Sequence, residues 1–182
     1  MLNIFVPLAG LLVLVAIFYF NSFIKKRNRM KEAWSGIDVY LKKRYELIPN
    51  LIDTVKAYAK HEQRLMLELT ELRNQAIQAP KNQEKINTEN QLAGHIGRLL
   101  IIAENYPDLK ANTNFLQLQT QLESIETEIE LARRYYNGTV RENNILVQSF
   151  PSNLIALIFG FKNGLFFEVV DATERNPVKA VF

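Results

Sequence analysis

The chain has 182 residues, of which 48% are hydrophobic, a composition that suits one domain with accessory segments and excludes an intrinsically disordered chain. Because there is no cysteine and only two histidines are present, disulfide scaffolds, cysteine nucleophiles and thiolate zinc sites are excluded. The formal net charge is +3, and its distribution along the chain decides what it means.

The first predicted element is a membrane anchor at residues 1–24. Residues 2–24 carry no charged side chain, and residues 4–20 are almost wholly apolar. About 20 helical residues cross the hydrocarbon core of a bilayer, so this segment is long enough to span it. A cleaved signal peptide is the alternative. No basic residue precedes the apolar run, which favours the uncleaved anchor.

A basic juxtamembrane collar at residues 25–31 follows the anchor. It contains Lys25, Lys26, Arg27, Arg29 and Lys31. The positive-inside rule then predicts a single-pass protein of the cell (inner) membrane, with its N-terminus outside and the rest cytoplasmic. When these five residues are left out, 17 of the 22 basic residues remain against 19 acidic residues, so the formal net charge of the rest of the chain is −2. The positive charge therefore predicts contact with the lipid bilayer, and no nucleic-acid partner is expected.

Beyond the collar, apolar residues recur in steps of three and four as far as residue 79, which predicts a long helix packed against partners. The stripe comprises Trp34, Ile37, Leu41, Ile48, Leu51, Val55, Tyr58, Leu65, Leu69, Leu72 and Ala76. Pro49 lies within it and removes one backbone donor, so we expect a kink or break there. Arg44 and Glu62 interrupt the stripe. We expect each to meet a polar residue on a facing helix, such as Glu126 or Arg134, and to fix the register.

Two further helices complete the predicted bundle. A polar turn at residues 78–82 precedes a helix at about 84–103, and Pro107 ends it. Its expected inner face is Ile86, Ala93, Ile96, Leu100 and Ala103, with Gly94 and Gly97 allowing close helix approach. The last helix is expected from a cap at Asp108 to about residue 147. Its stripe is Phe115, Leu118, Leu122, Ile125, Ile129, Ala132 and Tyr136. The predicted fold is all-α, an antiparallel three- or four-helix bundle over residues 32–149.

The C-terminal tail, residues 150–182, changes character. Residues 150–153 break the last helix, and residues 154–161 are then apolar on every side. Eight residues are too few to span a bilayer. Three roles remain open: the run could cap the bundle, lie in the membrane surface or dock on a partner. Capping is favoured because uncovered apolar runs are rare on soluble surfaces.

Several segments, in this order, resemble the LemA family of bacterial membrane-anchored proteins. They are Leu47-Ile48-Pro49-Asn50-Leu51, Tyr58-Ala59, His61-Glu62, Gly97-Arg98-Leu99-Leu100, Glu104-Asn105-Tyr106-Pro107, Leu109-Lys110-Ala111, Asn114-Phe115, Arg134-Tyr135-Tyr136-Asn137, Phe150-Pro151-Ser152-Asn153 and Phe159-Gly160-Phe161. The resemblance implies one N-terminal membrane helix, a helical bundle and no established enzymatic activity. Members of that family often occur beside membrane zinc metalloproteases, and one relative takes part in forming magnetosome membranes. Asn143-Asn144 stands where many members have a second Tyr-Asn.

The candidate interaction residues form three groups. Glu104, Asn105 and Tyr106 combine a carboxylate, an amide and a phenol that could grip a peptide or a headgroup, although turn formation already explains these residue types. The other groups are Tyr136 with Asn137, and Phe159 with Phe161. No phosphate loop, nucleophile elbow or metal-ligand spacing occurs in the sequence, so we predict no catalytic residue, cofactor or metal.

Two functions follow from these patterns. The first is a non-enzymatic scaffold or adaptor that presents the bundle to a protein partner, for which a membrane metalloprotease and further copies of the chain are the candidates. The alternative is a membrane-organising protein that self-associates and binds lipid through the basic collar and the apolar tail.

Overall fold

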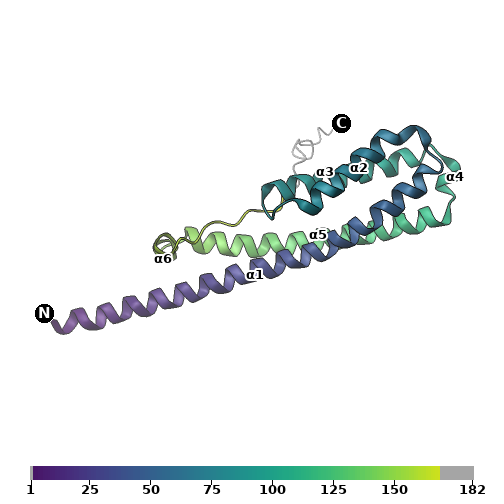
Figure 1. The fold of residues 1–182 in the computed structure, drawn as a ribbon. Helices are drawn as coiled ribbons and strands as arrows, with labels where there is room; N and C mark the ends of the chain where they lie inside the picture. The colour runs from purple at the N-terminus through teal and green to yellow at the C-terminus, as the bar shows by residue number, and fades with distance from the viewer. Residues whose placement is uncertain (1, 169–182) are drawn as a thin grey trace, which may run out of the picture. The chain divides into compact units, whose positions relative to one another are not determined.

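A computed structural model describes residues 2–168, with side chains from residue 7 onward, and this part is helical and without strands. The elements are α1 (Leu2–Lys56), a short 3-10 helix η1 (Lys60–Glu62), α2 (Gln63–Gln78), α3 (Gln83–Ala103), α4 (Pro107–Lys110), α5 (Thr113–Gln148) and α6 (Ser152–Phe159) (Figure 1). The predicted all-α fold is confirmed.

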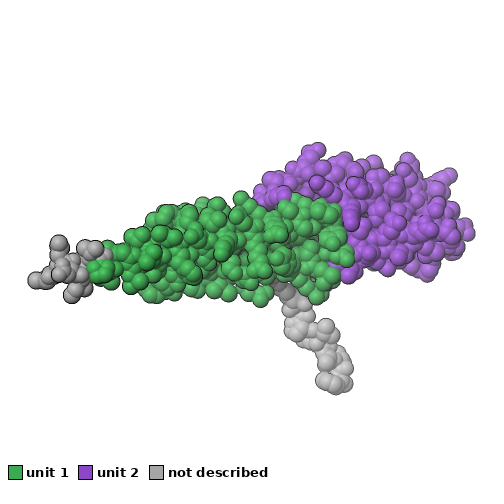
Figure 2. All heavy atoms as spheres, turned by 90° about the horizontal axis from the view of Figure 1, so that it is seen from below, with its two compact units in different colours: residues 1–40, 128–166 green, residues 41–127, 167–182 purple. Residues whose placement is uncertain are grey.

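The chain divides into two compact units (Figure 2). Unit 1 comprises Met1–Tyr40 and Glu128–Phe166, and unit 2 comprises Leu41–Thr127 and Phe167–Phe182. Unit 1 therefore contains the first part of α1, the last part of α5, and α6. Unit 2 contains the end of α1, the helices α2, α3 and α4, and the beginning of α5. Unit 2 thus has four longer helical segments, and four is the larger of the two numbers of helices predicted for the bundle.

In unit 1, α1 and α5 run antiparallel. Lys26 of α1 pairs with Glu142 of α5, and further along α1 the ring of Trp34 contacts that of Tyr136. In unit 2, α2 and α3 also pack as an antiparallel pair, since Lys85 near the start of α3 donates to the carbonyl of Ala76 near the end of α2.

Pro49 does not break α1, which corrects the expectation from the sequence. The helix continues to Lys56. A proline has no amide hydrogen, so the carbonyl of Tyr45, four residues earlier, loses its usual helical donor. Arg73 of α2 replaces that donor, with its Nε 2.8 Å from the Tyr45 oxygen. The break comes instead after Lys56, where the buried Ala59 precedes η1.

Two asparagines cap the following helices. The side-chain oxygen of Asn82 accepts from the Glu84 amide at 2.9 Å and begins α3, close to the predicted start. Asn112 accepts from the Phe115 amide at 3.0 Å and caps α5. The expected cap at Asp108 was therefore wrong, because that residue lies within the short α4.

The predicted stripes supply most of the buried core. Its α1 and α2 members include Trp34, Ile37, Leu41, Ile48, Leu51, Val55, Leu65, Leu69 and Ala76, and its α5 members include Phe115, Leu122, Ile129 and Tyr136. On α3, Leu92 and Leu99 are buried in place of the expected Ala93 and Leu100. The prediction for Gly94 and Gly97 was wrong, since an added Cβ at either position would meet no atom within 4 Å.

Candidate functional site

The first part of α1 is long and apolar enough to cross a membrane. Its most apolar 18-residue window has a mean hydropathy of 2.1, and only 6% of that window is buried among the described residues. Leu12 is 62% exposed and Phe18 is 70% exposed. Apolar side chains left open in this way need an apolar environment to cover them.

The C-terminal tail returns to the end of this apolar segment. After α5 the chain turns through a cis Phe150–Pro151 bond and forms α6. The ring of Phe159 meets that of Phe20 edge to face at 5.0 Å. Phe161 stacks on the fully buried Phe23, with ring centroids 4.5 Å apart and planes 10° from parallel. The predicted candidates Phe159 and Phe161 thus lie beside the end of the anchor segment of α1.

Only one side of α6 is covered within the described chain. Ser152 and Ala156 are buried, whereas Leu157 is 83% exposed and Ile158 is 72% exposed. The helix ends at Gly160, whose φ of 70° lies in the left-handed region that favours glycine. Thus one side of α6 is covered, and its other side is apolar and open.

The five basic residues of the collar have three kinds of surroundings. Lys26 Nζ lies 2.6 Å from Glu142 Oε2, and Arg29 Nη1 lies 3.7 Å from the same oxygen. The hydrogen bond and charge of Lys26 lower the pKa of the Glu142 carboxyl. The guanidinium of Arg27 lies 5.9 Å from the centre of the Phe161 ring. Two further collar residues, Lys25 and Lys31, are exposed.

Polar side chains of α5 hold the segment that follows α6. Asn143 Nδ2 donates to the Lys162 carbonyl at 3.1 Å. Asn144 exchanges two hydrogen bonds with the backbone of Gly164, at 3.1 and 2.7 Å. No local pattern in the sequence identifies these asparagines as contacts of the tail. The available signal in the sequence is their spacing, because Asn143-Asn144 follows Tyr136-Asn137 by two helical turns and lies on the same side of α5.

Tyr136 supports the same segment. Its hydroxyl donates to the Leu165 carbonyl at 2.9 Å, and its ring packs edge to face on Trp34 at 5.1 Å. Burial raises the pKa of the Tyr136 phenol. Asn137, the other residue of this candidate pair, is half-buried on α5.

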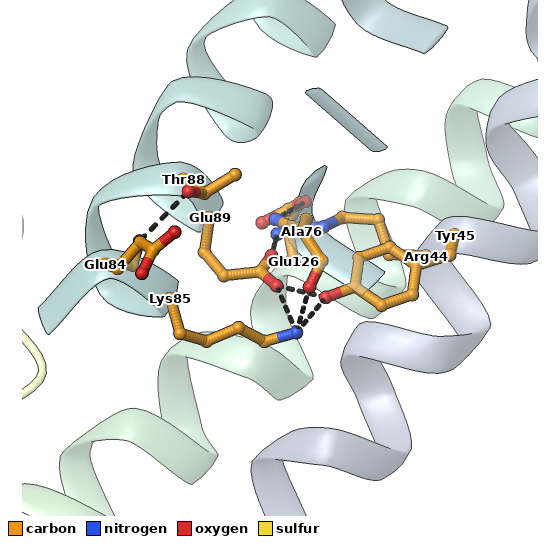
Figure 3. Close-up of polar contacts among 8 residues, drawn as sticks. All are labelled: Arg44, Tyr45, Ala76, Glu84, Lys85, Thr88, Glu89 and Glu126. Carbon is orange, nitrogen blue, oxygen red and sulfur yellow. Dashed lines mark hydrogen bonds and ion pairs between the residues drawn. The ribbon is translucent and has the colours of Figure 1, made fainter. Parts of the chain in front are cut away.

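Unit 2 contains a cluster of buried charges (Figure 3). Arg44 is fully buried and donates to Glu126 Oε1 at 2.8 Å and to Glu89, whose side chain is also fully buried. Burial alone would lower the pKa of the Arg44 guanidinium, but the nearby carboxylates of Glu126 and Glu89 outweigh it and raise the pKa. The expected pairing of Arg44 with Glu126 is confirmed.

Lys85 completes the buried charge cluster. Its ammonium lies 3.3 Å from Glu89 Oε1 and donates to the hydroxyl of Tyr45 at 2.9 Å and to the Ala76 carbonyl (Figure 3). Tyr45 in turn donates to Glu89. Two cations and two carboxylates therefore balance, and each is held by partners on other helices. Such a charge-balanced buried network fixes helix register, and its charged groups bond to one another, although the Nε of Arg44 has no hydrogen-bond partner among the described residues.

The predicted candidates at the end of α3 serve the turn there. Glu104 accepts from Lys110, and the Asn105 amide donates to the Ile102 carbonyl at 3.0 Å. The hydroxyl of Tyr106 lies 3.4 Å from Glu62 Oε1, so Glu62 meets Tyr106 and not Arg134.

These turn residues belong to unit 2, whereas Tyr136, Asn137, Phe159 and Phe161 belong to unit 1. Among the described residues, there is also no group of three or more histidine, aspartate or glutamate side chains placed to hold a metal ion.

Known proteins resemble this chain over most of its length. A protein named LemA from Metamycoplasma hominis is 26% identical over 171 residues, covering 90% of this chain and 78% of the relative. Magnetosome protein MamQ 2 of Paramagnetospirillum magneticum is 21% identical, and MamQ of Magnetospirillum gryphiswaldense is 20% identical. The matched regions span 64% of the length of each magnetosome protein. The LemA family model matches residues 33–182, which begin just after the collar, and the protein therefore belongs to the LemA family.

Proposed function

We propose that this protein is a single-pass scaffold of the cell (inner) membrane that presents unit 2 to a protein partner in the cytoplasm. One observation carries the proposal. The apolar segment and the buried Arg44 belong to the same uninterrupted helix, α1, which extends from Leu2 to Lys56. A break at Pro49 would have separated the last turns of this helix from the anchor. The helix continues because Arg73 donates to the Tyr45 carbonyl, which the proline leaves without its helical donor. One unbroken helix therefore contains both the membrane segment and a core residue of unit 2.

The basic collar supports an orientation with the N-terminus outside. Positively charged residues next to a membrane helix remain on the cytoplasmic side during insertion. Lys25 and Lys31 are exposed, so their charge is available to headgroups. Lys26 and Arg29 are shared with Glu142.

Binding is a better description of unit 2 than catalysis. A general acid or base must come within hydrogen-bond reach of a substrate. Arg44 and Glu89 are fully buried and committed to each other. Outside this cluster, Leu67 of α2 is 71% exposed and Ile101 of α3 is 72% exposed, and such apolar side chains can contact a partner. The partner candidates are a membrane metalloprotease and a second copy of the chain.

Photocrosslinking in cells tests the scaffold. A photoreactive amino acid is placed at Leu67 or at Ile101 of the full-length chain, and attached chains are identified after purification. Leu69 is the matched control, because it is fully buried on α2 and a probe there reaches only its own chain. A specific membrane protein attached at Leu67 or Ile101 and absent at Leu69 supports the proposal. Adducts to lipid alone would overturn it.

The alternative, a membrane-organising protein that self-associates and binds lipid, is favoured by a separate observation. The open side of α6 lies beside the end of the apolar segment, where Phe159 contacts Phe20. This contact favours a role for α6 at the membrane surface and says nothing of a protein partner.

A further inference from the structure

The open side of α6 is an apolar surface that nothing in the described chain covers. Leu157 and Ile158 are 83% and 72% exposed, Leu154 is 52% exposed, and Phe150 just before the helix is 80% exposed. Positions 154, 157 and 158 are three and four residues apart, so they lie on one face of the helix. A soluble surface rarely leaves such a continuous patch open, and eight residues cannot cross a bilayer.

The depth of α6 follows from its contact with α1. Phe159 meets Phe20, which lies five residues before Lys25, the first residue of the basic collar. Five helical residues correspond to about 7.5 Å along the axis. Helices that lie in the plane of a membrane bury their apolar face roughly 5–10 Å into the boundary between headgroups and acyl chains. The end of α6 is therefore at the depth of an interfacial helix.

We propose that α6 lies in the interface of the bilayer that α1 crosses, with Leu154, Leu157 and Ile158 against acyl chains. The inference rests on the proposed function in one respect, namely that α1 spans the membrane. Arg27, whose guanidinium is near the Phe161 ring, and the exposed Lys162 after the helix are then at the level of the lipid phosphates.

Continuity with α1 identifies the occupant of this surface as lipid. Phe159 and Phe161 contact Phe20 and Phe23, so aromatic side chains join α6 to the end of the apolar segment of α1. Phe18, two residues before Phe20, is 70% exposed on α1 and needs an apolar environment, as the open face of α6 does. The chain then contacts the membrane through α1 and through α6. The contact of α6 fixes which face of α1 is turned toward α5 and α6.

Fluorescence quenching of the full-length chain tests the proposal. Because the chain has no cysteine, single Leu157→Cys and Ile158→Cys variants can each carry one environment-sensitive dye. Both side chains point away from the covered side of α6, so the labels leave its packing intact. The protein is reconstituted, one copy per disc, in nanodiscs of phosphatidylethanolamine and phosphatidylglycerol. Quenching by lipids with a nitroxide on the acyl chain is compared with quenching by iodide in the water.

Two reference positions make the result interpretable. Leu12→Cys reports the anchor, where the side chain is 62% exposed on α1. Leu131→Cys is the matched control, an apolar side chain 51% exposed on α5. It lies 11 residues before Glu142, the partner of Lys26, which places it about 16 Å farther from the collar along the helix.

We expect labels at Leu157 and Ile158 to be quenched by the nitroxide lipids as strongly as Leu12, and several-fold more than Leu131. Quenching at Leu12 but not at Leu157 and Ile158 would overturn this inference and leave the anchor in place. Quenching at none of these positions would overturn the proposed function as well. A Leu157 label protected from iodide and from nitroxide lipid would show that protein covers α6, which also contradicts the inference.

Discussion

Replacing Arg44 by Met should strongly destabilise unit 2. The Arg44 side chain is fully buried between Glu89 and Glu126, and removing it leaves the equally buried Glu89 carboxylate with the weaker compensation of Lys85 at 3.3 Å. The cluster changes from balanced to a net charge of −1. Loss of one partner from a buried ion pair costs about 3–5 kcal/mol, because the remaining charge is desolvated without compensation.

The cost is measurable as a shift of the unfolding temperature. For a chain of this size, 1 kcal/mol corresponds to roughly 2–4 °C, so Arg44→Met should lower the midpoint by about 6–20 °C. Circular dichroism of the full-length protein in detergent micelles follows the transition. Arg134→Met is the matched control, since Arg134 is 70% exposed and pairs with Glu130 on the same helix. That change should cost at most about 0.5 kcal/mol.

A second substitution separates the charge argument from simple loss of packing. In the triple variant Arg44→Met/Lys85→Met/Glu89→Met, all three buried charges are gone, while Glu126, whose side chain is 35% exposed, regains contact with water. Replacing a whole buried ionic cluster by apolar side chains is often nearly neutral, so the triple variant should recover most of the stability lost in Arg44→Met. A triple variant that loses as much as the three single variants together would refute the reasoning.

Three further predictions concern other contacts. Arg73→Met should cost about 1–3 kcal/mol by removing the donor that compensates for Pro49. In a Pro49→Ala background an amide returns, so thermal unfolding should show a smaller cost, and equal costs would contradict this. Gly160→Ala should cost roughly 1–2 kcal/mol in denaturant unfolding, because the φ of 70° is strained for alanine, and an unchanged midpoint would argue against it. The Lys26 bond lowers the pKa of Glu142 below the ordinary 4.5, so the carboxylate stabilises the fold above that pH, and this stabilisation is lost as pH falls through the folded pKa. Carboxyl NMR titration measures this, and a pKa at or above 4.5 would contradict it.

The sequence was sufficient to predict Arg44 and its partner because a charge within an apolar stripe is conspicuous. Arg44 occupies a core position of α1, and Glu126 lies where the facing helix can reach it. Periodicity and turn residues likewise predicted α3 and the end of α2 to within a residue or two. These features depend on local patterns, which a single sequence contains in full.

Features that depend on distant partners were not predictable in this way. Lys85 and Glu89 are four residues apart on α3, a spacing that usually indicates an ion pair on a helix surface. Their burial follows from Arg44, which is more than 40 residues away. Pro49 indicated a break for a sound local reason, and the compensating Arg73 belongs to another helix. The place of α6 likewise depended on the path of the whole chain.

In unit 1 the end of the apolar segment of α1, the end of α5 and the start of α6 lie close together. Together they explain where α5 ends. On α1, the charged residues begin at Lys25, directly after the apolar segment. Glu142 of α5 pairs with Lys26, and α5 ends only six residues later, at Gln148. There the chain reverses into α6, whose open face is apolar. With α1 across the membrane as proposed, a longer polar α5 would enter the hydrocarbon core, so in that arrangement the bilayer surface sets the point at which helix pairing gives way to lipid contact.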